Sequence, residues 1–225
     1  IFYTPFRDLL DGQIEALTSV KGVKKKALNE ATLIANTYNP LNNISDHKNH
    51  AFITETQNGF LVASGTWLIS EPLIISGNLE INQGTKLIFK KDSYLIVQGG
   101  LKSLGSKGSR VEFLAESDSW KGLYVLGDGS SSIVSNTTFH STSELRDGIL
   151  QLTGGVTFYN SDLSISNSSF NNATGEDALN IIKSKFAIDN LAINGTYSDG
   201  LDFDFSSGLM TNSIFSNVGG DAIDI

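Results

Sequence analysis

Apolar and polar residues alternate within a short unit that occurs three times near the C-terminal end of the chain. The unit reads Asp, small residue, aliphatic residue, Asn or Asp, apolar residue, and its copies begin at Asp177, Asp199 and Asp221, 22 residues apart. One large apolar residue precedes each copy and gives a second register: Phe170, Ile193 and Phe215. Alternation with period two is typical of β-strands, and a fixed period of about 20 to 30 residues is typical of solenoids. The pattern therefore predicts a β-solenoid in which each turn stacks on the next.

The alternation also predicts which side chains share a face. In the second copy, Leu201 and Phe203 fall on one side of the strand and the acidic residues on the other. If the apolar side chains face the core, Asn180, Asp202 and Asp224 form one outward column, with a step of about 4.8 Å between turns. Such a column is costly unless cations, hydrogen bonds or shifted pKa values relieve the repulsion between its charges.

Short apolar segments continue upstream from residue 60. Gly, Asn, Ser or Lys separates most of these segments, among them Phe60-Leu61-Val62, Trp67-Leu68-Ile69, Leu87-Ile88-Phe89, Tyr94-Leu95-Ile96-Val97 and Leu123-Tyr124-Val125. Gaps this short leave no room for helical crossovers, so each strand is expected to pair with its equivalent in the next turn. Residues 126–176 follow the pattern less regularly. We assign Asp147-Gly148-Ile149-Leu150-Gln151 as the strand before the three regular copies.

Residues 5–38 have a helical periodicity instead, and Asn39-Pro40 ends it. The first apolar residues of this segment fall on one helical face: Phe6, Leu9, Leu10, Ile14 and Leu17. A solenoid needs a cap over its first turn. We therefore expect residues 1–40 to form an α-helical cap, or alternatively a linker to an upstream domain, and residues 41–225 to form the β-helix.

Two groups of segments resemble right-handed parallel β-helices of the pectin-lyase-like superfamily. The first group resembles the opening turns of such proteins: residues 77–89, residues 95–101, Val111-Glu112-Phe113 and Trp120-Lys121-Gly122-Leu123. The second comprises the later Asp-Gly-Leu-Asp and Gly-Gly-Asp-Ala-Ile-Asp units. The resemblance covers residues 60–225 and is more specific for fold than for activity. It implies an all-β, right-handed parallel β-helix with about 22 residues per regular turn.

The superfamily contains polysaccharide lyases, polygalacturonase-like hydrolases, mannuronan epimerases, phage tailspikes and non-catalytic surface proteins. The turns look most similar to bacterial β-helix proteins found near exopolysaccharide machinery. The resemblance therefore implies a polysaccharide partner and an extracellular or periplasmic location.

Charge and composition narrow the set of partners. The net charge is −8, and residues 122–225 alone hold 3 Lys/Arg and 12 Asp/Glu. An acidic half of this kind argues against nucleic acid and is compatible with divalent cations or sugars. No apolar run approaches 18 residues, so no membrane span is expected. The chain contains no Cys, begins at Ile1 without a signal sequence and ends inside the third copy, so we expect a longer protein with a possible neighbouring domain.

The outward acidic residues are the candidates for catalysis. Asp202 and Asp204 lie two residues apart on one strand, with Cα atoms about 6.6 Å apart, and Asp224 lies one turn from Asp202. Inverting glycosidases hold two carboxyl groups about 6.5–9.5 Å apart, so these three are candidate catalytic residues of a hydrolase. Similarity to pectate-lyase-like members instead implies a Ca²⁺ ion held by acidic side chains, and the candidate ligands are Asp202 and Asp224.

Other residues limit these expectations. A lyase needs a base near the acidic residues, but Lys183 and Lys185 are expected at a corner and His140 in a surface turn. The Asp-Pro-His-Asp motif of the epimerases is absent. The first Asp of each copy has a structural alternative, because an Asp side chain at a strand entry can bond its own backbone. The acidic residues in the middle of the strands also have an alternative role, in which they form a solvated face of the coil.

Asn180, Trp120 and Tyr124 are the candidate substrate-binding residues, the two aromatic rings by stacking on a sugar. The alternative for Trp120 is packing at a corner of the coil. Two functions follow: a polysaccharide-binding β-helix that cleaves or modifies its ligand, or a non-catalytic surface, adhesin or assembly module. A phage tailspike fragment is a third reading.

Overall fold

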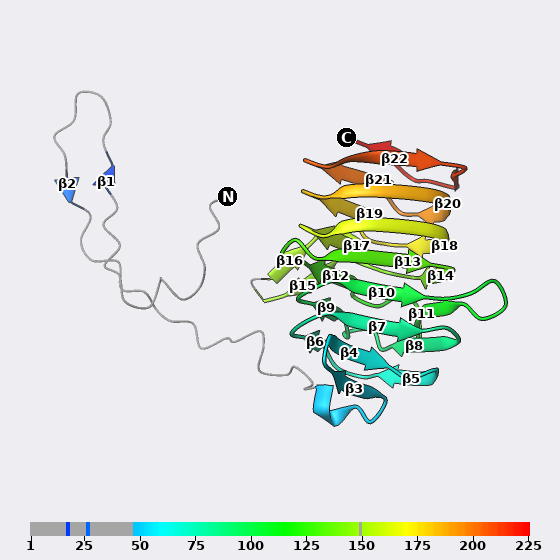
Figure 1. Cartoon of the computed structure of the whole chain (residues 1–225). Coiled ribbons are helices and arrows are strands. Elements are labelled where there is room, and N and C mark those ends of the chain that lie inside the picture. Colours follow the sequence, from blue (N-terminus) through cyan, green and yellow to red (C-terminus); the bar gives the residue numbers. More distant parts are fainter. Residues whose placement is uncertain (1–16, 19–25, 28–46, 149) are drawn as a thin grey trace. The chain divides into compact units, whose positions relative to one another are not determined.

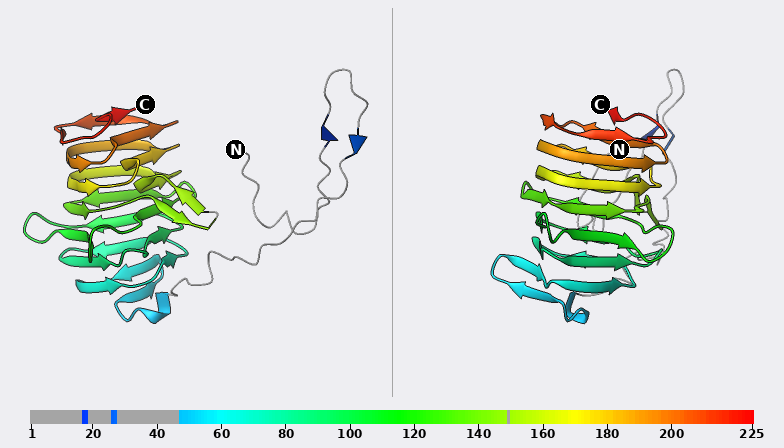
Figure 2. Two further views of the ribbon diagram at one scale, coloured as in Figure 1. Left: turned by 180° about the vertical axis from the view of Figure 1, so that it is seen from behind. Right: turned by 90° about the vertical axis from the view of Figure 1, so that its right-hand side faces the viewer.

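The computed structural model describes residues 17–18, 26–27, 47–148 and 150–225. The chain divides into two units, Ile1–Asn39 and Pro40–Ile225. In the second unit, short strands stack turn upon turn into a parallel β-helix (Figures 1 and 2). No helix among the described residues is long and apolar enough to cross a membrane.

One side of the coil is a seven-stranded parallel sheet with one strand from each turn. Its strands are β6 (Leu73–Ile75), β9 (Leu95–Val97), β12 (Leu123–Leu126), β17 (Gly154–Tyr159), β19 (Asp177–Ile182), β21 (Asp199–Asp204) and β24 (Ile223–Asp224). Equivalent residues in successive strands are 22, 28, 33, 23, 22 and 22 residues apart along the column that begins at Leu73. The 22-residue period predicted from the C-terminal copies is therefore confirmed, and the two longer steps contain insertions.

A thirteen-stranded sheet bends around the other two sides. One side carries β4 (Gly59–Val62), β7 (Leu79–Asn82), β10 (Leu101–Leu104), β13 (Ser131–Ser135) and β22 (Ser207–Thr211). The other carries β5 (Gly65–Ile69), β8 (Thr85–Phe89), β11 (Val111–Ala115), β14 (Thr137–His140) and β23 (Ile214–Ser216). Both sides share the long strands β18 (Asp162–Ala173) and β20 (Lys185–Thr196).

Asparagines make the bend within the long strands. Asn167 in β18 and Asn190 in β20 have φ values of 50° and 55°, a left-handed conformation that Asn tolerates better than most residues. The Asn190 side chain donates a hydrogen bond of 2.8 Å to Asn167 Oδ1 one turn away. These stacked amides hold successive corners in line.

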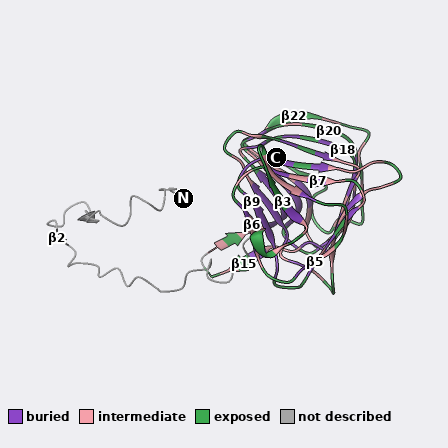
Figure 3. Ribbon diagram, turned by 60° about the horizontal axis from the view of Figure 1, so that its bottom comes forward, coloured by how far each residue is buried: buried purple, intermediate pink, exposed green. Residues whose placement is uncertain are grey.

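Alternate residues of the strands fill the inside of the coil with apolar side chains, commonly two from each strand, while much of the connecting chain remains exposed (Figure 3). Aromatic rings stack along this core: Phe113 on Phe139 and Phe139 on Phe170, with ring centroids 4.7 Å apart in both pairs. The predicted pairing of Phe170, Ile193 and Phe215 is confirmed by the strand register.

The first turn is covered by residues 47–56. A short 3₁₀ helix, η1 (His47–Asn49), leads into β3 (Ile53–Thr56), which pairs antiparallel with β4. The Phe52 ring stacks on Trp67 with centroids 4.9 Å apart, and the His47 ring lies 4.5 Å from Phe60. In the described part of the chain, this hairpin has the capping role that we expected of an α-helical segment.

Two predictions about which secondary structure the chain forms are corrected. Leu17–Thr18 (β1) and Lys26–Ala27 (β2) pair as antiparallel strands, so the helix expected over residues 5–38 is not present at these four positions; the rest of that segment lies outside the described residues. Asp147 does not belong to a turn of the coil. It ends β15 (Leu145–Asp147), which forms an antiparallel pair with β16 (Leu150–Leu152). The strand that precedes β19 in the sheet is β17.

Candidate functional site

The central outward column of the seven-stranded sheet changes from apolar to acidic along the coil. In order of the strands, the aligned residues are Ile74, Ile96, Tyr124, Thr157, Asn180, Asp202 and Asp224. The register thus confirms the predicted column of Asn180, Asp202 and Asp224. The acidic end of this face is the candidate site.

The apolar end of the column is covered by the β15–β16 hairpin. Leu145 packs with Tyr94, Ile96 and Tyr124 in a second apolar cluster outside the coil. Tyr94 donates a hydrogen bond of 3.0 Å to Asp147 Oδ2, and burial raises the pKa of Tyr124 above its usual range. The hairpin therefore closes this part of the face and leaves the acidic end beside it.

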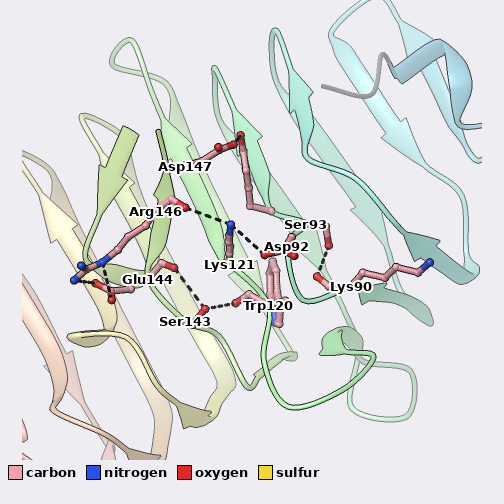
Figure 4. A network of polar contacts seen from close by, with 10 residues as sticks. Lys90, Asp92, Ser93, Trp120, Lys121, Ser143, Glu144, Arg146 and Asp147 are labelled. Carbon is pink, nitrogen blue, oxygen red and sulfur yellow. Dashed lines mark hydrogen bonds and ion pairs between the residues drawn. The ribbon is translucent and has the colours of Figure 1, made fainter. Parts of the chain in front are cut away.

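Polar contacts hold the hairpin in place (Figure 4). Lys121 Nζ lies 3.2 Å from Asp92 Oδ1 and donates to the Arg146 carbonyl at 3.3 Å. Within the hairpin segment, Arg146 Nε lies 2.9 Å from Glu144 Oε1. One lysine thus connects the coil to the hairpin backbone.

Both aromatic residues proposed to stack on a sugar are buried, which corrects that expectation. Neither Trp120 nor Tyr124 has any exposed surface. The Trp120 ring stacks on Phe89 with centroids 3.9 Å apart, and its Nε1 donates to the His140 carbonyl at 3.0 Å. Trp120 has the alternative role of corner packing, and Tyr124 lies under the hairpin.

Asn180 connects two acidic side chains. Its Nδ2 donates to Asp202 Oδ2 at 3.0 Å and to Asp177 Oδ2 at 3.3 Å. Asn180 is 5% exposed, and its Oδ1 has no hydrogen-bond partner among the described residues. A buried carbonyl oxygen without a donor typically costs about 1–3 kcal/mol, so this atom points to a missing partner.

The acidic residues of this cluster hold protons more tightly than isolated carboxyl groups. Burial, followed by the charge of Asp202, raises the pKa of Asp177 to about 7. Burial, followed by the charges of Asp204 and Asp224, raises the pKa of Asp202 to about 6. The predicted repulsion along the column is thus relieved in part by proton uptake and by the Asn180 hydrogen bonds.

The leading acidic residues of the copies differ in role. Asp199 Oδ1 accepts the backbone N–H of Asp221 at 2.7 Å, which is a structural contact between turns. Asp177 is buried and bonded to Asn180, so it belongs to the candidate site. Sequence analysis missed Asp177 because the three copies look alike at this position.

A second outward column lies beside the first and runs through Leu126, Tyr159, Ile182 and Asp204. Tyr159 is 41% exposed and is available to a ligand on this face. It was missed because the strand containing it was not recognised. The next residue after Asp204, Phe205, is 93% exposed with φ of 51°, a conformation that bulky side chains rarely adopt.

Three basic residues are the candidates for the base that a lyase would require. Lys183 is exposed at a corner with φ of 52°, as expected, and Lys185 begins β20 in the other sheet. His140 lies in β14 of the other sheet, with Nδ1 2.8 Å from Ser141 Oγ and Nε2 3.2 Å from Asn172 Nδ2. Lys183 is next to Asp204, since its backbone N–H bonds the Asp204 carbonyl at 2.7 Å. In the described part of the chain, however, no ion pair joins Lys183, Lys185 or His140 to an acidic side chain.

The side chains of the acidic cluster meet the ligand requirements of a Ca²⁺ ion only in part. Across residues 47–148 and 150–225 and the two short strands before them, no group of three or more His, Cys, Asp or Glu side chains is arranged to hold a metal ion. Asp177, Asn180 and Asp202 nevertheless offer the oxygen atoms that Ca²⁺ prefers. Because Ca²⁺ takes 6–8 such ligands, an ion here would need further oxygens from a bound ligand or water.

Comparison of the chain with protein-family models, with curated proteins and with solved structures found no match. The parallel β-helix therefore stands on the strand register alone. We infer function from the residues exposed on its faces.

Proposed function

We propose that the acidic end of the seven-stranded sheet binds a polysaccharide and that Asp202 and Asp204 hydrolyse it. The observation that carries this proposal is the buried, unpartnered Oδ1 of Asn180 between Asp177 and Asp202. A sugar hydroxyl would donate to this oxygen and accept from a protonated carboxyl group in the same cluster. Polyhydroxylated ligands supply both functions at once.

Tyr159 gives this face an apolar platform. Its register places it two strands from Asp204 in the adjacent column, a distance of about 9.6 Å at about 4.8 Å per strand. If one sugar ring lay on Tyr159 and the next beside Asp202, the sugar chain would run along the axis on which the turns stack. The ligand class rests also on the resemblance of residues 60–225 to pectin-lyase-like β-helices, and we include this chain among them as part of the proposal.

The carboxyl pair suits acid–base hydrolysis. With its pKa raised to about 6, Asp202 retains its proton in mildly acidic solution and can donate it to a leaving oxygen. Asp204 lies two residues along the same strand, at the about 6.6 Å Cα spacing of alternate strand residues. A side-chain hydrogen bond with Asp204 helps to keep this proton on Asp202, so the two carboxyl groups lie closer together than the about 6.5–9.5 Å of inverting glycosidases, and their spacing does not predict inversion.

An extracellular or periplasmic location belongs to the same proposal, and Ca²⁺ belongs to its calcium-dependent alternative. In that alternative Asp202 is deprotonated, and an ion shared between Asp177, Asn180, Asp202 and an acidic sugar would neutralise both sides of the contact. Asp224 stands one turn further along the column and would extend the negative surface toward the ligand. A polysaccharide outside the cytoplasm is the target that this surface would meet.

The experiment is a binding and digestion panel with pectin, alginate, polygalacturonate and neutral bacterial glycans, each with calcium and with chelator. Asp202→Asn should abolish new reducing ends while the fold remains intact by circular dichroism. Asn180→Ala and Tyr159→Ala should weaken binding. Glu55→Gln is the matched control, because it removes one exposed negative charge from the capping hairpin.

Each result decides between the two functions. Binding that Asn180→Ala weakens, without turnover on any glycan, supports the non-catalytic module and removes the hydrolase. An unsaturated product that disappears with chelator replaces hydrolysis by calcium-dependent elimination. No binding to any glycan overturns the proposal.

A further inference from the structure

A groove of about 790 Å³ lies on the thirteen-stranded sheet, apart from the acidic face. Strands β4, β7 and β10 form its floor, the turn at Thr56–Asn58 forms one wall, and Ser130 and Ser131 contribute to its edge. A volume in this range is typical of sites that hold small ligands. The outward residues of its floor, in strand order, are Leu61, Glu80 and Lys102.

The groove has a fixed frame. Asn78 Nδ2 donates to the Asn58 carbonyl at 3.3 Å, and Asn78 Oδ1 accepts the Gly100 N–H at 2.7 Å. One side chain thus connects the wall to the floor. A Cβ atom at Gly100 would lie 2.4 Å from the Ser131 carbonyl oxygen, so glycine is required for the edge to close on the floor.

The two charges in the groove are opposite and unpaired. Glu80 and Lys102 are aligned on neighbouring strands, yet neither has an ion pair or a side-chain hydrogen bond with any described residue. Lys86 and Glu112 have the same alignment on β8 and β11 and form an ion pair of 2.9 Å. The carboxylate and the ammonium of the groove are therefore both available to a ligand.

We propose that this groove binds a short peptide with a free ammonium and a free carboxylate. Glu80 pairs with the ammonium and Lys102 with the carboxylate, so a ligand with only one of these charges meets repulsion from the other residue. Leu61 offers apolar contact for a side chain. The amides and hydroxyls at the edge, such as Asn58 and Ser130, can bond peptide groups, and the volume favours a peptide over a single amino acid.

The test is a calorimetric titration of the full chain with the tripeptide Ala-Leu-Ala and with its N-acetylated and C-amidated forms. Free peptide should bind at least about tenfold more tightly than either blocked form, because each blocked form loses one charge-assisted contact. Lys102→Gln should remove the difference between the free and C-amidated forms. Glu80→Gln should remove the difference between the free and N-acetylated forms.

Lys86→Gln is the matched control, because it removes a lysine charge from an equivalent strand position outside the groove. It should bind the free peptide like the parent chain. Equal affinity for free and blocked peptides overturns the proposal, as does the absence of peptide binding. Binding of maltotriose but not of the tripeptide would make the groove a sugar site instead. Asp202→Asn should leave peptide binding unchanged, which separates this site from the acidic face.

Discussion

The Asp177–Asn180–Asp202 cluster places two carboxyl groups around one amide. The sequence unit gave the position of Asn180 and Asp202, because residues at the same place in successive copies pair across a parallel ladder. It could not separate Asp177 from Asp199, which align with one another. Only their surroundings differ: Asp177 is 4% exposed, and Asp199 bonds the backbone of the next turn.

The raised pKa of Asp177 predicts a pH-dependent stability. An unfolded Asp titrates near about 3.9, whereas folded Asp177 holds its proton to about pH 7. Between these values the folded state binds more protons, so the free energy of unfolding should fall as pH rises. Urea denaturation from pH 4 to pH 8 should show this fall, and Asp177→Asn should make it shallower.

Asp118→Asn provides the comparison for this measurement, because it removes an exposed carboxyl group outside the cluster. It should keep the slope of the parent chain. A slope in Asp177→Asn equal to that of the parent would show that Asp177 does not hold its proton in the folded state.

At the scale of elements, the β15–β16 hairpin determines how much of the seven-stranded sheet is open. It is the longest insertion in the coil, within the 33-residue step from Leu123 to Val156. Apolar and polar residues alternate within residues 145–152, and this pattern predicts a strand in another turn of the solenoid. The hairpin pairs with itself instead, and its apolar side covers Tyr94 and Tyr124.

Leu145→Ala should destabilise this part of the protein. Leu145 is fully buried in the outer cluster, and Leu→Ala changes at buried sites typically cost about 2–5 kcal/mol. Urea denaturation measures the loss, and tyrosine absorbance against pH should show Tyr124 ionising at lower pH than in the parent. Leu209→Ala, at a residue that is 68% exposed, should stay within about 0.5 kcal/mol of the parent.

At the scale of the whole molecule, each turn of the coil contacts mainly its two neighbours, so stability should vary along the axis. Middle turns have a stacked turn on both sides and a continuous aromatic core. The turn that contains β22, β23 and β24 leaves Leu209, Ile214 and Ile223 at 40% or more exposure. It is the least covered turn in the described part of the chain.

Native-state hydrogen exchange should therefore be fastest in β22–β24 and slowest in β9, β12 and β17. Local openings need less free energy where fewer apolar contacts are broken. Exchange followed by mass spectrometry on the 225-residue chain measures the gradient. Uniform protection across all turns would show instead that the coil opens as one cooperative unit.

The sequence by itself determined the parallel β-helix, its 22-residue period and the outward column of Asn180, Asp202 and Asp224. It could do so because a parallel ladder aligns equivalent residues of each copy, and alternation assigns their faces. Only the tertiary structure decided which side chains are covered by other parts of the chain. Tyr124 is buried by the inserted hairpin, Trp120 is buried by stacking on Phe89 of another turn, and the turn at Thr56–Asn58 forms one wall of the groove at Glu80. Local periodicity carries no record of such contacts.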